Sequence, residues 1–201
     1  MAYANWVTPN KTQGNGNDTV SWTGQNHTGR NARQTTATFS ASGVESKTLT
    51  IIQAGKTEFV TIETTAAVSK NGGTLTITGT SNTSKLTFSL TGTDGIGLTL
   101  PTKYTANSVE TNNGTAISGD PGAVQQYTFS ITFTGIAANT TINPRTAQLT
   151  VTANGSQTAV CDITQAAGDP YLTVSPTTLN LTAEGTAASV TVQSNTTWSV
   201  S

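Results

Sequence analysis

The feature that most constrains the fold of this 201-residue chain is an internal repeat. When the sequence is moved along itself by 112 positions, residues 33–54 fall on residues 145–166 without a gap, with seven identities in 22 positions. Two of the identical pairs have long polar side chains, and we interpret them as structural: Arg33 with Arg145, and Gln53 with Gln165. A repeat of this length predicts tandem modules that share one fold.

A second match, at a shift of 113, joins residues 72–83 to residues 185–196. Read together, the two matches divide the chain into three predicted parts. Residues 1–55 form a module that lacks its first strands, residues 56–167 form a complete module with a long insertion at about 91–124, and residues 168–201 form the opening half of a third module.

The local pattern predicts strands throughout. Apolar residues alternate with Thr or Ser in segments such as 74–78, 127–133 and 148–152, and turn signals such as Asn113-Gly114 lie between such segments. Strands that bury one face belong to antiparallel sheets. We therefore expect an all-β fold of tandem immunoglobulin-like β-sandwich modules, the last of them incomplete.

Composition excludes several classes of partner. Only 9% of residues are charged and the formal net charge is −1, so the basic surface of a nucleic-acid-binding protein is missing. No apolar run is long enough to cross a membrane. The first residues show no basic stretch followed by an apolar core, so we expect synthesis in the cytoplasm rather than export through a signal peptide.

No pattern of reactive residues indicates catalysis. His27 is the only histidine, in a polar stretch where a solvated surface residue is expected, and Cys161 sits in an alternating strand, where a buried small hydrophobe is expected. The ten acidic residues are scattered, without the spacing of a calcium loop. We expect no enzymatic activity, no cofactor and no bound metal.

Several of these segments resemble a known family. The opening from Leu172 to Pro176, followed by Ser194-Asn195 and Trp198, and the close from Arg33 to Gly55, resemble the BACON domain. This resemblance implies an immunoglobulin-like module of Bacteroidetes surface proteins and of the phages that infect them. It also implies a phage virion structural protein of the crAss-like type.

The two end segments together carry about one module. On the family pattern, residues 168–201 supply the half that residues 1–55 lack, and a half-sandwich exposes an unpaired edge and an apolar face. We expect head-to-tail strand complementation between copies, through Trp6, Leu172, Val174, Val190, Val192 and Trp198. The alternative is that the chain simply ends early, with further residues downstream.

The insertion at about 91–124 is the other candidate for binding a partner. A compact domain rarely carries such an excursion without a use. It is expected to lie over a partner or to form an extra hairpin, and the alternative is a solvated excursion. Its apolar residues are the candidate contacts: Ile96, Leu98, Leu100, Tyr104 and Val109.

Two functions from different classes fit these observations. The first is a virion protein on the particle exterior, an auxiliary or decoration protein of the capsid or the base of a head fibre, which binds the major capsid protein and copies of itself. The second is a carbohydrate-binding or adhesin module of a Bacteroidetes surface protein. The three tryptophans are expected to be buried at core positions, whereas a groove lined by exposed Trp and Tyr would favour the second function.

Overall fold

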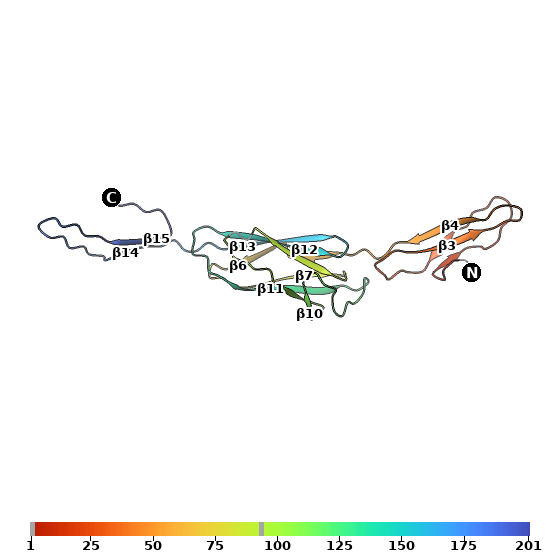
Figure 1. Ribbon diagram of the computed structural model, residues 1–201, viewed down its shortest axis with the longest axis horizontal. Coiled ribbons are helices and arrows are strands. Elements are labelled where there is room, and N and C mark those ends of the chain that lie inside the picture. The colour runs from red at the N-terminus through yellow and green to blue at the C-terminus, as the bar shows by residue number, and fades with distance from the viewer. Residues whose placement is uncertain (1–2, 93–94) are drawn as a thin grey trace.

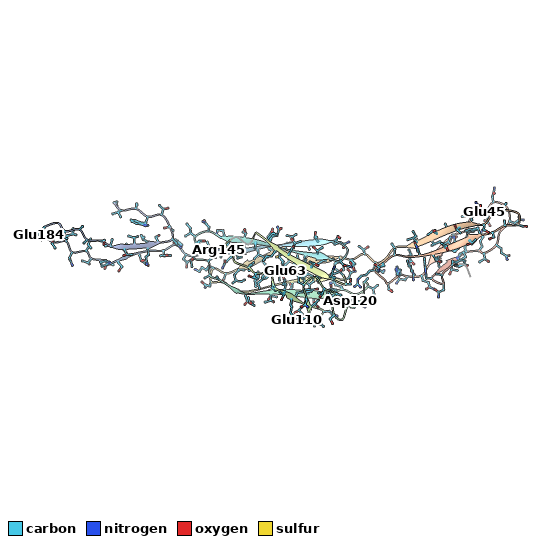
Figure 2. All side chains as sticks on the ribbon, viewed as in Figure 1. Glu45, Glu63, Glu110, Asp120, Arg145 and Glu184 are labelled. Atoms are coloured by element: carbon cyan, nitrogen blue, oxygen red, sulfur yellow. The ribbon has the colours of Figure 1, made fainter. Side chains whose placement is uncertain are left out.

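The computed structural model describes residues 3–92 and 95–201, and within them every regular element is a β-strand. The all-β prediction is therefore confirmed. The strands lie in three groups along an elongated molecule, with residues 3–55 at one end and residues 168–201 at the other (Figure 1). Side-chain labels in Figure 2 mark both tips, Glu45 at one and Glu184 at the other.

The middle group is a two-layer sandwich. One sheet has the strand order β10-β9-β11-β7-β5 and the other has the order β6-β13-β12-β8. The first sheet contains β5 (Val60–Ile62), β7 (Gly73–Ser81), β9 (Lys103–Ala106), β10 (Val109–Asn112) and β11 (Tyr127–Ile136). The second sheet contains β6 (Thr65–Val68), β8 (Leu86–Thr91), β12 (Arg145–Ala153) and β13 (Thr158–Gln165).

Alternation decides which residues fill the space between these sheets. Along β11 and β12, every second residue is apolar and buried, while Thr, Ser or Gln faces outward. The aromatic centre is formed by Phe88, Tyr104 and Phe129, with ring centroids 4.9 Å apart for Phe88 and Tyr104 and 5.7 Å apart for Phe88 and Phe129. Burial of these rings supplies much of the hydrophobic stabilisation of the sandwich.

The end groups are thinner. Residues 3–55 form two separate antiparallel ribbons, and residues 168–201 form one. The N-terminal ribbons pair β1 (Val7–Pro9) with β2 (Trp22–Gly24) and β3 (Arg33–Phe39) with β4 (Lys47–Gln53). The C-terminal ribbon pairs β14 (Leu172–Ser175) with β15 (Thr191–Ser194).

Register shows that the sequence repeat is a repeat of structure. Arg33 lies opposite Gln53 in the β3–β4 pair, and Arg145 lies opposite Gln165 in the β12–β13 pair. The β14–β15 ribbon likewise has the register of β5 and β7: Leu172 lies opposite Ser194 as Val60 lies opposite Ser81. The N-terminal ribbon thus matches the closing strands of the middle sandwich, and the C-terminal ribbon matches its opening strands.

Hydrogen bonds outside the strands repeat as well. Ser81 Oγ donates to the Phe59 carbonyl at 2.6 Å, and Ser194 Oγ donates to the Tyr171 carbonyl at 2.8 Å. The adjacent asparagines also behave alike, because Asn82 and Asn195 each accept a bond from the backbone N–H of those same aromatic residues. The motif Ser-Asn-Thr therefore fixes the opening ribbon of each module in the same way.

Arg30 fixes the N-terminal ribbons to the middle sandwich. Its guanidinium makes an ion pair with Glu58 at 2.8 Å, two hydrogen bonds with the Asp120 carboxylate at 2.7 and 2.8 Å, and one with the Asn82 carbonyl at 2.7 Å. Burial raises the pKa of Asp120, but the bonds from Arg30 and from the Gly122 N–H outweigh it and leave this pKa below its ordinary value. A half-buried arginine with this many acceptors holds one orientation.

Candidate binding site

The N-terminal ribbons leave the inner side of a sandwich uncovered. We define the N-terminal face as Ala37, Phe39, Leu49 and Ile51. At a shift of 112 these residues correspond to the fully buried core residues of the middle sandwich, which are Leu149, Val151, Cys161 and Ile163. Of these four residues only Ala37 is buried, whereas Phe39 is 46% exposed and Leu49 is 37% exposed.

A groove of about 790 Å³ borders this face at Ala37 and Phe39. Ala37 and Phe39 line one side, and Tyr3 and Trp22 contribute aromatic rings that meet edge to face at 5.2 Å. The loop between β1 and β2 closes the groove with residues 11–14. Two of the lining residues, Ala37 and Phe39, thus stand at positions whose equivalents are covered in the middle sandwich.

The strands beside this groove have free edges. In the middle sandwich β13 pairs with β12 on one side and with the parallel strand β6 on the other. Its equivalent β4 pairs with β3, and β2 pairs with β1, with no further partner strand within residues 3–92 and 95–201. Unpaired N–H and C=O groups along such edges are ready to accept another strand.

A polar network holds the N-terminal face in position. Arg33 Nε donates to Gln53 Oε1 at 2.9 Å, and both side chains donate to the Gln25 carbonyl at 2.8 and 2.9 Å. The guanidinium also stacks 4.5 Å from the centre of the Trp6 ring. In the middle sandwich Gln165 donates to the equivalent carbonyl, that of Ala137, at 2.7 Å. Arg33, Gln53 and Gln165 thus bond backbone carbonyls at the ends of strands.

The C-terminal ribbon exposes a matching apolar surface. We define the C-terminal face by its apolar side chains: Leu172, Val174, Leu179, Leu181 and Val190. Leu181 is 63% exposed and Leu172 is 56% exposed, although Val60, which corresponds to Leu172, is buried in the middle sandwich. Val190 corresponds to Ile77, which is fully buried. Of the residues predicted for pairing between copies, Leu172, Val174 and Val190 belong to this face.

The remaining predicted pairing residues differ in their burial. Trp198 is 49% exposed, so the expected burial of this ring is wrong for the chain as it stands, because no sheet of the described residues covers it. Val192 is partly buried in β15. Trp6 is buried within the N-terminal ribbons, where it already packs against Arg33. Trp6 is therefore not available to a partner.

The predicted contacts of the insertion need a larger correction. Residues 93 and 94 lie outside the described residues, but the rest of the insertion is described, and its strands β9 and β10 form a hairpin that extends the first sheet. Ile96, Leu98 and Tyr104 are buried in the core, and Leu100 packs against it. Only Val109 is exposed. A partner cannot reach the buried three, so their assignment to a binding surface is wrong.

His27 is bonded rather than solvated. Its Nε2 lies 2.7 Å from the Asn31 carbonyl and its Nδ1 accepts the Gly29 N–H at 3.4 Å. Asn139, at the equivalent position, donates to the Asn143 carbonyl at 2.8 Å and accepts the Thr141 N–H at 3.0 Å. The imidazole therefore makes the same loop contacts as the Asn139 side chain. His27, which was expected to be solvated, has a structural role in this loop.

The remaining candidate reactive groups are a buried cysteine and scattered carboxylates. Cys161 is a buried free thiol, and desolvation raises its pKa to about 11, helped by the nearby Glu63 and Asp162 carboxylates. Among the described residues no three His, Cys, Asp or Glu side chains gather where they could hold a metal ion. Nor does this part of the chain contain a helix with the length and apolar character to span a membrane.

Sequence reasoning missed Phe39, Leu49 and Ile51 as site residues, although the signal was present. The 112-residue shift places them on the buried apolar residues of the next module. The role of Arg30 had no such signal, because Ile142 occupies the equivalent position.

Comparison with known proteins bears on this same segment. Residues 1–54 match the model of the BACON family, described as "Putative binding domain, N-terminal". The segment that carries the groove thus resembles a family of binding domains. No curated protein matches the chain.

Proposed function

We propose that this chain is a non-enzymatic structural protein that binds its partner by completing the sandwich at the N-terminal face. The observation that carries the proposal is the exposure of Phe39 and Leu49 at positions whose equivalents, Val151 and Cys161, are fully buried. Free edges on β2 and β4 frame these residues. An apolar β-segment that enters the groove gains backbone hydrogen bonds and a core at the same time. Such binding needs no cofactor.

The wider role that fits this mode of binding is assembly on the exterior of a phage particle. We propose an auxiliary or decoration protein of the capsid, or the base of a head fibre, that contacts the major capsid protein. An elongated, Thr-rich chain with little charge is suited to a spacer on the particle surface. The exposed apolar residues of the N-terminal and C-terminal faces are suited to contacts between proteins. The low charge argues against a nucleic-acid partner.

A glycan-binding module is the second candidate, because Tyr3 and Trp22 line the groove and the BACON description names binding. Aromatic rings stack on sugars when they lie flat and open to solvent. Here the two rings meet edge to face, and Trp22 is only partly exposed. The rest of the lining mixes polar residues with the apolar side chains of Val20, Ala37 and Phe39. The edge-to-face rings are therefore the observation that favours a protein segment over a sugar.

Incorporation into particles tests the proposed function. Phage particles produced in the presence of the tagged protein are purified and analysed by mass spectrometry and immunogold labelling. The tagged wild-type protein is expected on the particle surface, Phe39→Asp is expected to reduce incorporation at least about 10-fold, and Thr36→Asp, on the opposite side of the same strand, is expected to leave it unchanged. Absence of the wild-type protein from particles would overturn the virion role.

A glycan array separates the two candidates. The structural proposal predicts no specific glycan signal for the full chain. Specific binding that Trp22→Ala abolishes and Thr36→Asp preserves would replace the structural proposal with the carbohydrate-binding function.

A further inference from the structure

We propose that the segment which fills the groove is residues 169–201 of a second copy of this chain, in a register that the middle sandwich defines. The inference rests on the proposed function, because it takes the groove as the binding site and names its occupant. Its basis is the internal repeat: the middle sandwich contains both halves of the module in one chain and so shows how they fit.

In the middle sandwich the opening strands cover the closing strands. β6 runs parallel to β13, with Ala66 beside Ile163 and Val68 beside Gln165. β7 runs antiparallel to β11, with Gly73 opposite Ile136 at the end of β11. Val68 lies in the same sheet as β12 and β13, and Ile77 lies in the opposite sheet. Both belong to one core with the residues that correspond to the N-terminal face.

The closing half of this template transfers to residues 24–55 without ambiguity. The 112-residue shift holds from Gln25, whose carbonyl accepts from Gln53 as the Ala137 carbonyl accepts from Gln165, through the whole of β3 and β4. Ile51 and Gln53 therefore stand where Ile163 and Gln165 stand.

The opening half transfers to residues 172–196 with one inserted residue. The shift is 112 at Leu172 and 113 at Gly185, which shares a positive φ with its equivalent Gly72, 71° against 72°. The segment 178–181 alternates Thr-Leu-Asn-Leu, and this matches the alternation of β6 at the larger shift, where Leu179 and Leu181 replace Ala66 and Val68. Period-two alternation makes this choice decisive, since a slip of one residue would turn both leucines away from the core.

The register between copies follows directly. Residues 178–181 of one copy lie parallel to β4 of the next, with Leu179 beside Ile51 and Leu181 beside Gln53. Residues 186–190 lie antiparallel to β2, with Thr186 opposite Gly24, and Val190 enters the groove above the N-terminal face. The apolar side chains exposed on both ends are then buried against each other.

The two segments cannot meet within one copy, because they lie at opposite ends of an elongated molecule (Figure 1). Contact between different surfaces of neighbouring copies generates open chains or rings. The joints between modules also repeat: the Lys56 N–H donates to the Gly29 carbonyl at 2.8 Å, and the Gly168 N–H donates to the Thr141 carbonyl at 2.7 Å. Each copy therefore adds one middle sandwich and one composite sandwich to the open chain or ring, and the same backbone hydrogen bond occurs at both joints.

Cysteine cross-linking of the full chain tests the register. Neighbouring strands lie about 4.8 Å apart, within the Cα separation that a disulfide tolerates. The double variant Ile51→Cys/Leu179→Cys is expected to form a ladder of covalent multimers on a non-reducing gel after mild oxidation. The matched control Ile51→Cys/Asn180→Cys, displaced by one residue, is expected to cross-link at least about 10-fold less. The native Cys161 is buried and stays in place in both.

Mixing the two single variants provides a second readout that does not depend on the double variant. Ile51→Cys with Leu179→Cys is expected to give a covalent dimer and no larger species, whereas each variant alone gives none. Circular dichroism establishes that the variants keep the β signal of the wild-type protein. Equal cross-linking of both double variants, or a mixture that stays monomeric, would overturn the proposed register.

Light scattering of the wild-type chain over a range of concentrations separates this inference from the proposed function. The inference requires a mass that grows with concentration and falls for Phe39→Asp. If the chain remains a monomer while Phe39→Asp still loses incorporation into particles, a second copy is not the occupant, but the groove remains a binding site. If neither effect is found, the proposed function fails as well.

Discussion

The middle sandwich and the end ribbons place equivalent side chains in opposite environments. Val151 and Cys161 are fully buried, while Phe39 and Leu49, at the equivalent positions, are 46% and 37% exposed. The backbone register around them is the same. Residue type alone therefore does not decide burial here, and the difference comes from whether an opening half-module lies on top of the closing strands.

The same type of apolar residue contributes differently to stability in the two regions. In the middle sandwich an apolar residue at such a position stabilises the module that contains it. In the N-terminal ribbons the same kind of residue contributes little until a partner covers it, since its apolar area stays in contact with water. The two regions should therefore respond very differently to the same substitution.

The largest expected effect comes from aspartate at the matched pair Val151 and Phe39. Val151→Asp is expected to destabilise the middle sandwich by more than about 4 kcal/mol, because it buries an unpaired charge. Phe39→Asp is expected to change the stability of the dilute protein by about 1 kcal/mol or less. Chemical denaturation followed by circular dichroism measures both, and equal losses at the two positions would contradict the comparison.

Thiol reactivity gives the next effect. Burial raises the pKa of Cys161 to about 11, so its thiolate is scarce at neutral pH and a thiol reagent reaches it only when the sandwich opens. In Leu49→Cys the new thiol lies at the equivalent but exposed position and is expected to react with Ellman's reagent at least about 100-fold faster. Protection of this new thiol as protein concentration rises would sharpen the comparison by showing that a second copy covers it.

The sequence predicts the arrangement of strands better than the position of the binding surface. Period-two alternation and the 112-residue repeat depend on local pattern, and they correctly predict the all-β fold. Exposure depends on which strands are available to cover a face, and no local pattern records that. The prediction that Ile96 and Tyr104 bind a partner is therefore wrong. Tyr104, in β9, and Ile96, in the segment before β9, both lie in the core.

The joints between modules offer a second comparison. At the first joint Arg30 bonds Glu58, Asp120 and the Asn82 carbonyl. At the second joint the equivalent residue is Ile142, which is exposed, and the Asn195 amide donates instead to the Thr140 carbonyl at 3.0 Å. The first joint should therefore be the stiffer of the two.

Arg30→Ile makes the first joint resemble the second. The substitution is expected to weaken docking of the N-terminal ribbons by about 1–3 kcal/mol, because it leaves the nearly buried Glu58 carboxylate without its cation. Hydrogen exchange of the amides near Lys56 measures the loss. The control Lys47→Met removes an exposed ion pair with Glu45 and is expected to change stability by less than about 0.5 kcal/mol. Unchanged exchange in Arg30→Ile would show that backbone bonds alone hold the joint.

The same joint should weaken in acid. Although burial raises the pKa of Asp120, Arg30 and the Gly122 N–H lower it below the ordinary value of 3.8. The stabilisation is therefore complete above about pH 3.8 and is lost as the pH falls through the lowered value in the folded protein. We expect a loss of about 1 kcal/mol or less at the joint. Wild-type protein should show this loss in exchange measured between pH 5 and pH 2.5, and Asp120→Asn should not.

The smallest expected effect tests whether the two loops before the joints are equivalent. His27 and Asn139 bond the same backbone groups, a carbonyl four residues ahead and an N–H two residues ahead. His27→Asn is therefore expected to change stability by less than about 0.5 kcal/mol, whereas His27→Ala loses both bonds and is expected to cost about 1–2 kcal/mol. Thermal unfolding followed by circular dichroism measures the two variants. If His27→Asn lowered the stability as much as His27→Ala, the imidazole would make a contribution that asparagine cannot replace. The two loops would then share their geometry but not the free energy that these bonds contribute.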